Sequence, residues 1–465
     1  MRKYLSFSIS LSVAALFTAC ASSNVNMDEV LSKMSKKGIQ LPYEVLRTDV
    51  LDMKTNKVFE IRNGGYGSDM VAHPKNNNQF YALTDRGPNA KYKGAYGKGK
   101  KFPTPNYTPR IGLFELQEDT SIILLKQILL KRPTGEEITG LPNSSALGGT
   151  GETPYNAKGE VIRLDMNKAY HKKNNPMRLD DYGLDGEGLV ALKDGTFWVS
   201  DEYGPHMVHF NAKGIEIERI NAFKNDIRTK FNLPQEYKNR RPNRGMEGLA
   251  SSLDEKILVG IMQSTLYNPS KKVKKLNLTR IVSINPKTGE TAQYLYKQEK
   301  AQNSNSGIVA IGKNTYYVIE RDGSFLKGGP KKANNKAQKH IYEIDLSKGS
   351  NLEEIKESAA IKQDEALGLM IEGKTLEEFV LQEGWQKLLD YGIKPVSKKL
   401  ILDMVKEVQY PHDKMEGLWL IKDGYIGILN DDDFATWSTK GKLHAKMLGT
   451  GKVDSNTLYI VNTKK

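Results

Sequence analysis

Carboxylates placed directly before glycines recur in this chain, and each pair is followed by an apolar run. The clearest pairs are Glu187-Gly188, Glu247-Gly248 and Glu416-Gly417. Carboxylates brought together repel one another and raise one another's pKa unless a cation lies among them. Because oxygen ligands without cysteine suit hard ions, a shared site would bind Ca²⁺, with Mg²⁺ as the second candidate. Such an ion binds phosphoryl oxygens and lowers the pKa of an attacking water, which is the chemistry of phosphoester hydrolysis.

The candidate metal ligands are the acids of these motifs and of fainter copies of them. They are Asp69, Asp85, Glu187, Glu247, Glu320, Glu416 and Asp431. Arg86 and Arg321 stand beside such acids, and a guanidinium can hold a phosphate through two parallel hydrogen bonds. Asp201 or Glu202 is the candidate general base, and His206 is the candidate acid for the leaving group.

A structural role is the alternative for each of these acids. A glutamate at the start of a strand can accept hydrogen bonds from the backbone N–H groups of the neighbouring repeat. An aspartate at a strand end can stabilise a turn. His206 and His209 have the spacing of a zinc pair, but the motif holds no third ligand.

The acid motifs lie on a repeated pattern of short strands. Each motif leads into an apolar strand, a polar turn and a second strand that ends in polar residues, and a further hairpin often follows. One unit therefore holds about four strands, as a propeller blade does. Gly188, Gly248 and Gly307 lie 60 and 59 residues apart, and the gaps of 118 residues from Met70 to Gly188 and of 110 from Gly307 to Gly417 equal about two units each. We expect an all-β propeller of six or seven four-stranded blades, in which the equivalent glutamates converge on one mouth of the central channel.

Insertions and a closing strand complete the predicted fold. Long insertions are expected at residues 94–110 and 133–178, with a short helix over residues 375–390. A closed ring also needs a strand from one terminus to complete a blade made mostly from the other. Residues 458–461 and the region 43–61 are the candidates.

The N-terminus has the features of a bacterial lipoprotein signal. Arg2 and Lys3 precede an apolar stretch that ends shortly before Cys20, which is the sole cysteine. We therefore expect a signal peptide over residues 1–19, lipid attachment at Cys20, a linker over residues 20–40 and one propeller domain over residues 41–465. The protein would be a monomer held in the cell envelope by its lipid anchor, in the periplasm or at the outer membrane.

Charge and missing motifs narrow the function classes. The formal net charge of +14 indicates solvated basic loops or attraction to a small phosphorylated substrate or a lipid headgroup. The basic tracts lack interleaved aromatic residues, so we expect no nucleic-acid partner. The chain has no G-x-S-x-G nucleophile elbow, no H-E-x-x-H and no phosphate-binding G-x-x-x-x-G-K-[ST] loop.

Taken in order, the acid motifs resemble those of the phytase-like family described as "esterase-like activity of phytase". The matching stretches are DRGPN at 85–89, DGEG at 185–188, SDEYGPH at 200–206, NRGMEGLA at 243–250, ERD at 320–322, EGL at 416–418 and NDDDF at 430–434. The last stretch departs from the family's usual NDNDF and adds a carboxylate at Asp432. The resemblance implies a propeller hydrolase of phosphoesters, and the alternative is a non-catalytic propeller that binds a ligand or an envelope protein at the same mouth.

Overall fold

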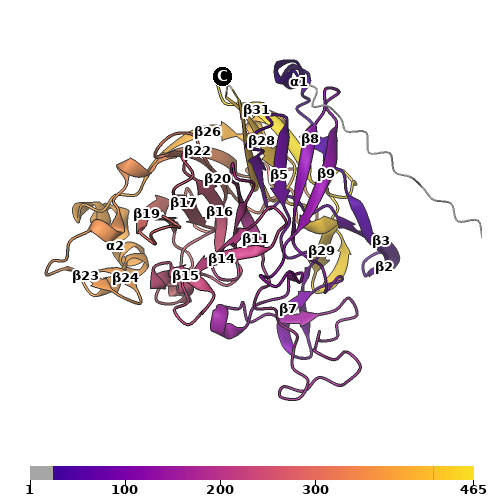
Figure 1. The fold of residues 1–465 in the computed structure, drawn as a ribbon, viewed down its shortest axis with the longest axis horizontal. Helices are drawn as coiled ribbons and strands as arrows, with labels where there is room; N and C mark the ends of the chain where they lie inside the picture. The colour runs from indigo at the N-terminus through magenta and orange to yellow at the C-terminus, as the bar shows by residue number, and fades with distance from the viewer. Residues whose placement is uncertain (1–24, 423, 465) are drawn as a thin grey trace, which may run out of the picture.

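Five sheets of four or five strands form the body of the protein. The computed structural model describes residues 25–422 and 424–464 (Figure 1). The first sheet contains β4 (Asp69–Ala72), β5 (Gln79–Leu83), β8 (Arg110–Leu116) and β9 (Ile122–Leu129). The second contains β11 (Gly186–Ala191), β12 (Phe197–Asp201), β13 (His206–Phe210), β14 (Glu216–Asn221) and β15 (Thr229–Asn232). The third contains β16 (Met246–Ser251), β17 (Leu258–Met262), β18 (Leu278–Ile284) and β19 (Thr291–Lys297).

The fourth and fifth sheets come from the C-terminal part of the chain and from one N-terminal strand. The fourth contains β20 (Ser304–Ala310), β21 (Thr315–Arg321), β22 (Lys339–Asp345) and β26 (Ser397–Asp403). The fifth contains β27 (Gly417–Lys422), β28 (Tyr425–Leu429), β31 (Thr457–Asn462) and β1 (Ile39–Gln40). Neighbouring strands are antiparallel in all five sheets, except that β14 and β15 are parallel.

The first strands of the five sheets pack against one another in a ring. β4, β11, β16, β20 and β27 are neighbours in that order, and β27 packs back against β4. Glycine permits this close approach: a Cβ on Gly248 would lie 2.3 Å from the carbonyl oxygen of Ser306, and one on Gly307 would lie 2.3 Å from that of Glu416. The repeated glycines of the acid motifs are therefore explained by backbone contact between adjacent blades.

A strand from the N-terminus closes the ring, as predicted. β1 pairs antiparallel with β31, with Ile39 opposite Leu458. The predicted C-terminal strand is correct, but the N-terminal partner is β1 and not the region 43–61. That region forms a separate hairpin of β2 (Glu44–Asp52) and β3 (Lys57–Asn63). Part of the expected linker thus belongs to the fold, because it supplies both β1 and helix α1 (Met27–Lys33).

The predicted count of six or seven blades is not confirmed, because the described residues contain only five sheets of this size. The two long gaps in the repeat hold insertions instead of further blades. The first gap contains β6 (Ala90–Gly94), β7 (Gly97–Lys101) and β10 (Thr153–Tyr155). The second contains β23 (Ile361–Asp364), β24 (Gly368–Ile371), β25 (Lys374–Thr375) and α2 (Leu376–Asp390), and α2 confirms the predicted helix. α3 (Met404–Val408) follows β26.

The two ends of the ring differ. We call the end at which the first strands begin the mouth face. It carries the insertion with β6 and β7, the β2–β3 hairpin and a second hairpin of β29 (Thr436–Thr439) and β30 (Lys442–Ala445). The opposite face carries the turns that join first to second strands, together with α1. Figure 1 shows α1 at one end of the molecule and β7 at the other.

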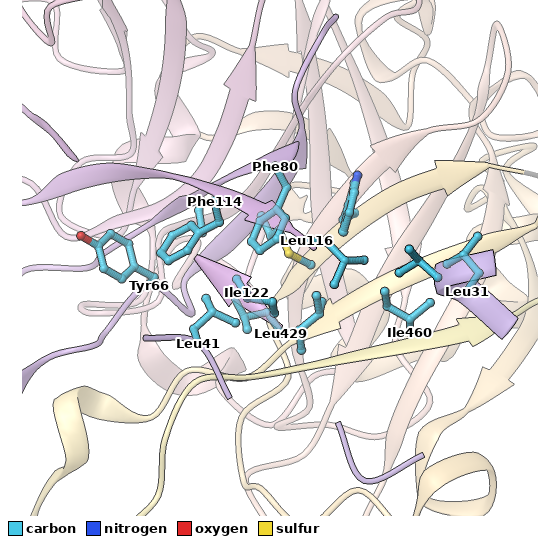
Figure 2. Close-up of a cluster of buried hydrophobic side chains, with 14 of the residues drawn as sticks. Leu31, Leu41, Tyr66, Phe80, Phe114, Leu116, Ile122, Leu429 and Ile460 are labelled. Atoms are coloured by element: carbon cyan, nitrogen blue, oxygen red, sulfur yellow. The ribbon is translucent and has the colours of Figure 1, made fainter. Parts of the chain in front are cut away.

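α1 is fixed to the opposite face by apolar packing. Leu31 lies in one buried cluster with Leu116 and Ile122, at the turn between β8 and β9 (Figure 2). The same cluster extends to Phe80 and Tyr66, so it connects this face to the interior of the first sheet. Among the described residues, no helix is long and apolar enough to span a bilayer.

Candidate functional site

A cavity of about 460 Å³ opens at the centre of the mouth face, and all five sheets contribute to its wall. Its acidic lining residues are Asp85, Glu152, Glu187, Glu202, Glu247, Asp413, Glu416 and Asp433. Its basic lining residues are Arg86, Lys91, Lys100, Arg241, Arg244, Arg321, Lys331 and Lys414. Charges of both signs therefore line one cavity, and some of them form ion pairs with each other while others do not.

Three glutamates meet in the wall of the cavity. We call Glu187, Glu202 and Glu247 the glutamate cluster, and one carboxylate oxygen of each lies within 4.8 Å of the others. Glu187 and Glu247 hold the same position in β11 and β16. A break in strand register occurs at each of these residues, and such bulges re-aim a side chain. The sequence prediction that the repeated glutamates converge on one mouth is correct for this pair and for Glu416.

The carboxylates of the glutamate cluster have few hydrogen-bond donors. Nε2 of Gln263 donates to Glu202 at 2.7 Å and to Glu247 at 2.6 Å. Arg321 reaches Glu247 at 3.6 Å and also pairs with Glu416. Within the described chain, no donor lies within hydrogen-bonding distance of the Glu187 carboxylate, although Glu187 is only 7% exposed.

Burial and the closeness of the other carboxylates raise the free energy of the ionised glutamates. Burial, followed by the charge of Glu247, raises the pKa of Glu187 well above its ordinary value. Burial and the charge of Glu202 do the same to the pKa of Glu247. An all-oxygen set with one unpartnered, buried carboxylate fits a hard divalent cation, which would relieve both penalties. The residues present therefore suit the predicted Ca²⁺ or Mg²⁺.

A second acidic group adjoins the cluster but contains its own cation. Asp85, Asp185 and Glu187 also bring carboxylate oxygens within 4.8 Å of one another. Arg86 pairs with Asp185 at 2.8 Å and with Glu152 at 3.2 Å, and burial raises the pKa of Asp185 to about 7. Arg86 thus serves two carboxylates already, which weakens its predicted role as a phosphate clamp.

Arg244 and Lys100 form no ion pair among the described residues, although the charge of Lys100 helps to lower the pKa of Glu152. Arg244 donates to the Ser304 hydroxyl at 3.2 Å, and Lys100 donates to the Asn89 side-chain oxygen at 2.8 Å. Burial and the nearby Arg241 lower the pKa of Arg244 to about 10, so its guanidinium stays charged at neutral pH. These groups are better suited than Arg86 to attract an anionic ligand.

On another side of the cavity, the buried Lys446 and the half-buried Lys414 neutralise the acids. We call Asp413, Asp431, Asp433 and Asp454, with Lys414 and Lys446, the lysine-neutralised cluster. The ammonium of Lys446 lies 2.9 Å from Asp413, 2.7 Å from Asp433 and 3.3 Å from Asp454. Lys414 pairs with Asp431 and lies 2.9 Å from Asp433. Asp431, a predicted metal ligand, is therefore part of an ion-pair network that needs no external cation.

Asp69 and Glu320 serve the framework, which corrects the prediction of metal binding. Asp69 accepts a hydrogen bond from the backbone N–H of Leu189 at 2.8 Å and so connects β4 to β11. This is the structural role given above as the alternative. Glu320 accepts from the Tyr296 hydroxyl at 2.9 Å and from Lys398 at 2.7 Å. Neither residue lines the cavity.

Asp201 and His206 also lie outside the cavity, so their predicted catalytic roles are not supported. Asp201 braces a turn, because it accepts the backbone N–H groups of Gly204 at 3.0 Å and His206 at 3.1 Å. The imidazole of His206 is fully buried, and neither ring nitrogen has a hydrogen-bond partner among the described residues. Burial lowers its pKa well below the ordinary value, so the ring stays neutral. Of the two candidate bases, only Glu202 faces the cavity.

Sequence reasoning assigned no role to Asp185, Gln263 or Lys446, and it noted Arg244 only as a cation beside the acids. Asp185 stands inside the quoted DGEG stretch, and Gln263 follows β17 as Glu202 follows β12, so the repeat could have revealed both. Arg244 stands within the NRGMEGLA stretch. Lys446 carries no motif, and its role depends on contacts with residues 13 and 33 positions away.

Comparison with known proteins identifies the family of most of the chain. The family model "Phytase-like: Esterase-like activity of phytase" matches residues 61–434. An uncharacterized secreted protein of Arthroderma benhamiae is 34% identical over an aligned length of 116 residues, and the match covers 20% of this chain and 22% of that protein. This match thus spans less than a quarter of the relative's length.

Similarity to solved structures is distant. The pyrroloquinoline-quinone-bound aldose sugar dehydrogenase of Streptomyces coelicolor is 10% identical, with a TM-score of 0.30 over 90% of this chain and 98% of that one. Streptogramin B lyase is 11% identical, with a TM-score of 0.28 over 92% of this chain and 100% of that one. At such scores these structures carry no argument about function.

Proposed function

The chain belongs to the phytase-like family, and on this premise we propose that it is a divalent-cation-dependent phosphoester hydrolase acting in the mouth cavity. The observation that carries the proposal is the glutamate cluster. Three carboxylates converge there, Arg321 reaches only Glu247 at 3.6 Å, and no described residue donates a hydrogen bond to the Glu187 carboxylate, so the cluster suits an added cation. Basic groups that form no ion pair among the described residues stand in the same cavity and suit a phosphorylated ligand.

In this proposal Glu187, Glu202 and Glu247 hold the cation, most suitably Ca²⁺. When bound, the ion lowers the pKa of a coordinated water and polarises a phosphoryl oxygen. Glu202 accepts the proton of the attacking water, and Gln263 keeps its carboxylate in place through the 2.7 Å hydrogen bond.

Basic residues of the cavity would orient the substrate. Arg244 binds the phosphoryl group, because among the described residues its guanidinium donates to the Ser304 hydroxyl and forms no ion pair. Arg321 lies between Glu247 and Glu416 and supports the geometry of the cluster. Lys100, whose pKa is lowered by burial and by the nearby Arg86, replaces His206 as the candidate proton donor to the leaving group.

For location, we propose a lipoprotein of the cell envelope, anchored through Cys20. Residues 1–24, which contain the expected signal peptide and Cys20, lie outside the described residues. The secreted relative of Arthroderma benhamiae is consistent with export. Cys20→Ser should move the protein from the membrane fraction to the soluble fraction, and a wild-type protein found soluble and without an acyl group would contradict this location.

The test of activity is a screen of the purified protein against phosphomonoesters, phosphodiesters and carboxyl esters, with Ca²⁺, Mg²⁺ or EDTA. Glu187→Gln should reduce cation-dependent phosphoester turnover by roughly a hundred- to thousand-fold, as loss of one preorganised electrostatic contact does. Glu118→Gln is the matched control, because Glu118 is exposed at the turn between β8 and β9 on the opposite face. Its turnover should equal that of the wild type.

The alternative function is a non-catalytic binding propeller. For this function, the wild-type protein should hydrolyse none of the esters but should gain thermal stability when Ca²⁺ is added. Glu187→Gln should abolish that gain. A protein with neither turnover nor a cation-dependent shift would contradict both the hydrolase and the cation site.

A further inference from the structure

The point at which the described chain begins lies far from the cavity. Met27, Val30 and Leu31 of α1 are buried against the first and fifth sheets, so the start of the chain cannot move freely over the surface. Figure 2 shows Leu31 at one end of this apolar cluster and Tyr66 at the other. The described chain therefore begins at the face opposite the mouth, next to α1 (Figure 1).

The strands give the separation between the two faces. β8 begins on the mouth face, where the N–H of Arg110 donates to Thr84 beside the cavity residue Asp85. It ends at Leu116, against α1. The six residue steps from Arg110 to Leu116 span roughly 20 Å at about 3.4 Å per residue. The insertions with β6–β7, β2–β3 and β29–β30 extend the molecule further on the mouth face.

The tether between the expected lipid and the fold is short. Only five residue steps separate Cys20 from Val25, where the description begins, and these span at most about 18 Å when fully extended. If the cavity faced the anchoring bilayer, the start of α1 would be at least a strand length away from it. The tether cannot bridge that distance.

We infer that the face carrying α1 lies against the bilayer and that the cavity opens away from it. The inference rests on the proposed function and on lipid attachment at Cys20. Its consequence concerns the substrate: between a dissolved phosphoester and a headgroup of the anchoring membrane, only the dissolved ester can enter the cavity. The enzyme would act on phosphoesters that diffuse through the envelope space.

Orientation can be measured without any activity. Cys20 is the sole cysteine and is occupied by lipid, so one introduced cysteine carries a single fluorophore. Lys75→Cys marks the turn between β4 and β5 on the opposite face, and Lys93→Cys marks β6 on the mouth face; both lysines are exposed. In vesicles with quencher-labelled headgroups, the label at position 75 should be quenched several-fold more than the label at position 93. Equal quenching, or stronger quenching at position 93, would overturn the inference.

Linker length tests the physical cause. A flexible insertion of about 30 residues after residue 24 reaches well beyond the thickness of the molecule. The difference in quenching between the two positions should then shrink to less than half. An unchanged difference would show that the short tether does not set the orientation.

The substrate consequence has its own measurement. Vesicle-anchored wild type and soluble Cys20→Ser should hydrolyse a dissolved aryl phosphomonoester within about two-fold of each other, while phosphatidic acid in the anchoring vesicle should remain intact. Hydrolysis of phosphatidic acid there at the rate of the dissolved ester would overturn the inference. If neither ester is cleaved, the proposed hydrolase fails, and the quenching experiment still decides the orientation.

Discussion

The two acidic clusters of the mouth cavity differ in how the negative charge of their carboxylates is neutralised. In the lysine-neutralised cluster, the fully buried Lys446 contacts three aspartates, and Lys414 contacts two. In the glutamate cluster, an amide and one distant guanidinium are the only partners among the described residues. Ionised groups of both clusters are buried, so each cluster needs positive charge nearby.

This difference in charge neutralisation indicates which acids stabilise the fold and which are candidates to bind a ligand. A lysine held by the fold neutralises its aspartates permanently, and such a network stabilises one arrangement of the loops. Carboxylates left without a fixed cation destabilise the fold unless protons or an added ion compensate. The glutamate cluster is thus the part of the cavity whose charge balance depends on the solution.

The largest expected effect is removal of the fixed cation. Lys446→Met keeps most of the aliphatic volume and removes the ammonium shared by Asp413, Asp433 and Asp454, so the buried Asp413 loses its ion pair. We expect a loss of about 3–5 kcal/mol in the free energy of unfolding, measured by urea denaturation in EDTA. Lys75→Met, at an exposed position, should stay within about 0.5 kcal/mol of the wild type. A loss below about 1 kcal/mol for Lys446→Met would remove the distinction between the clusters.

The glutamate cluster should show the reverse dependence on added cation. At a Ca²⁺ concentration of about 100 times the Kd, the wild type should gain about 2.7 kcal/mol in the free energy of unfolding. Glu187→Gln should lose most of that gain. In EDTA it should be at least as stable as the wild type, because one repelling charge is gone. Equal destabilisation with and without Ca²⁺ would assign Glu187 a structural role.

The smallest expected effect is the change in the free energy of unfolding with pH. This change has opposite signs for the glutamates and for the lysine-neutralised aspartates. Burial raises the pKa of Glu416 to about 7 and those of Glu187 and Glu247 well above the ordinary value. The folded protein thus holds protons that the unfolded chain releases near pH 4.3. Without metal, stability should therefore fall as the pH rises from about 4.5 to 8, because the unfolded chain releases these protons at a lower pH than the folded protein does.

The aspartates should respond at the acid end instead. Asp433 is half-buried, and Lys414 and Lys446 hold its pKa below the ordinary value. Its contribution is present above the pKa of an unfolded aspartate and is lost as the pH falls below about 4. Thermal melts in EDTA from pH 3 to 8 would separate the two effects, and Ca²⁺ should flatten only the upper range. A melting temperature that is constant between pH 4.5 and 8 would contradict the raised pKa values.

The sequence alone determined the repeat and its central positions. The spacing of Gly188, Gly248 and Gly307 predicted equivalent strands, and the structure places these glycines where neighbouring first strands touch. The convergence of Glu187, Glu247 and Glu416 followed from the same spacing, because equivalent positions around one axis must meet. Local patterns of this kind depend on residues close in sequence, so they could be read without the fold.

Only the tertiary structure decided which acids have a cation beside them. Asp431 and Glu187 stand in similar motifs, yet the first meets Lys414 and the second meets two further glutamates. Arg86 reaches Asp185 across 99 residues of sequence, and Asp69 binds the backbone of Leu189 across 120. The number of sheets was likewise decided by insertions that fill the gaps in the repeat. Burial and charge pairing depend on three-dimensional neighbours, and these are set by how the sheets pack and where the insertions fold back over the mouth.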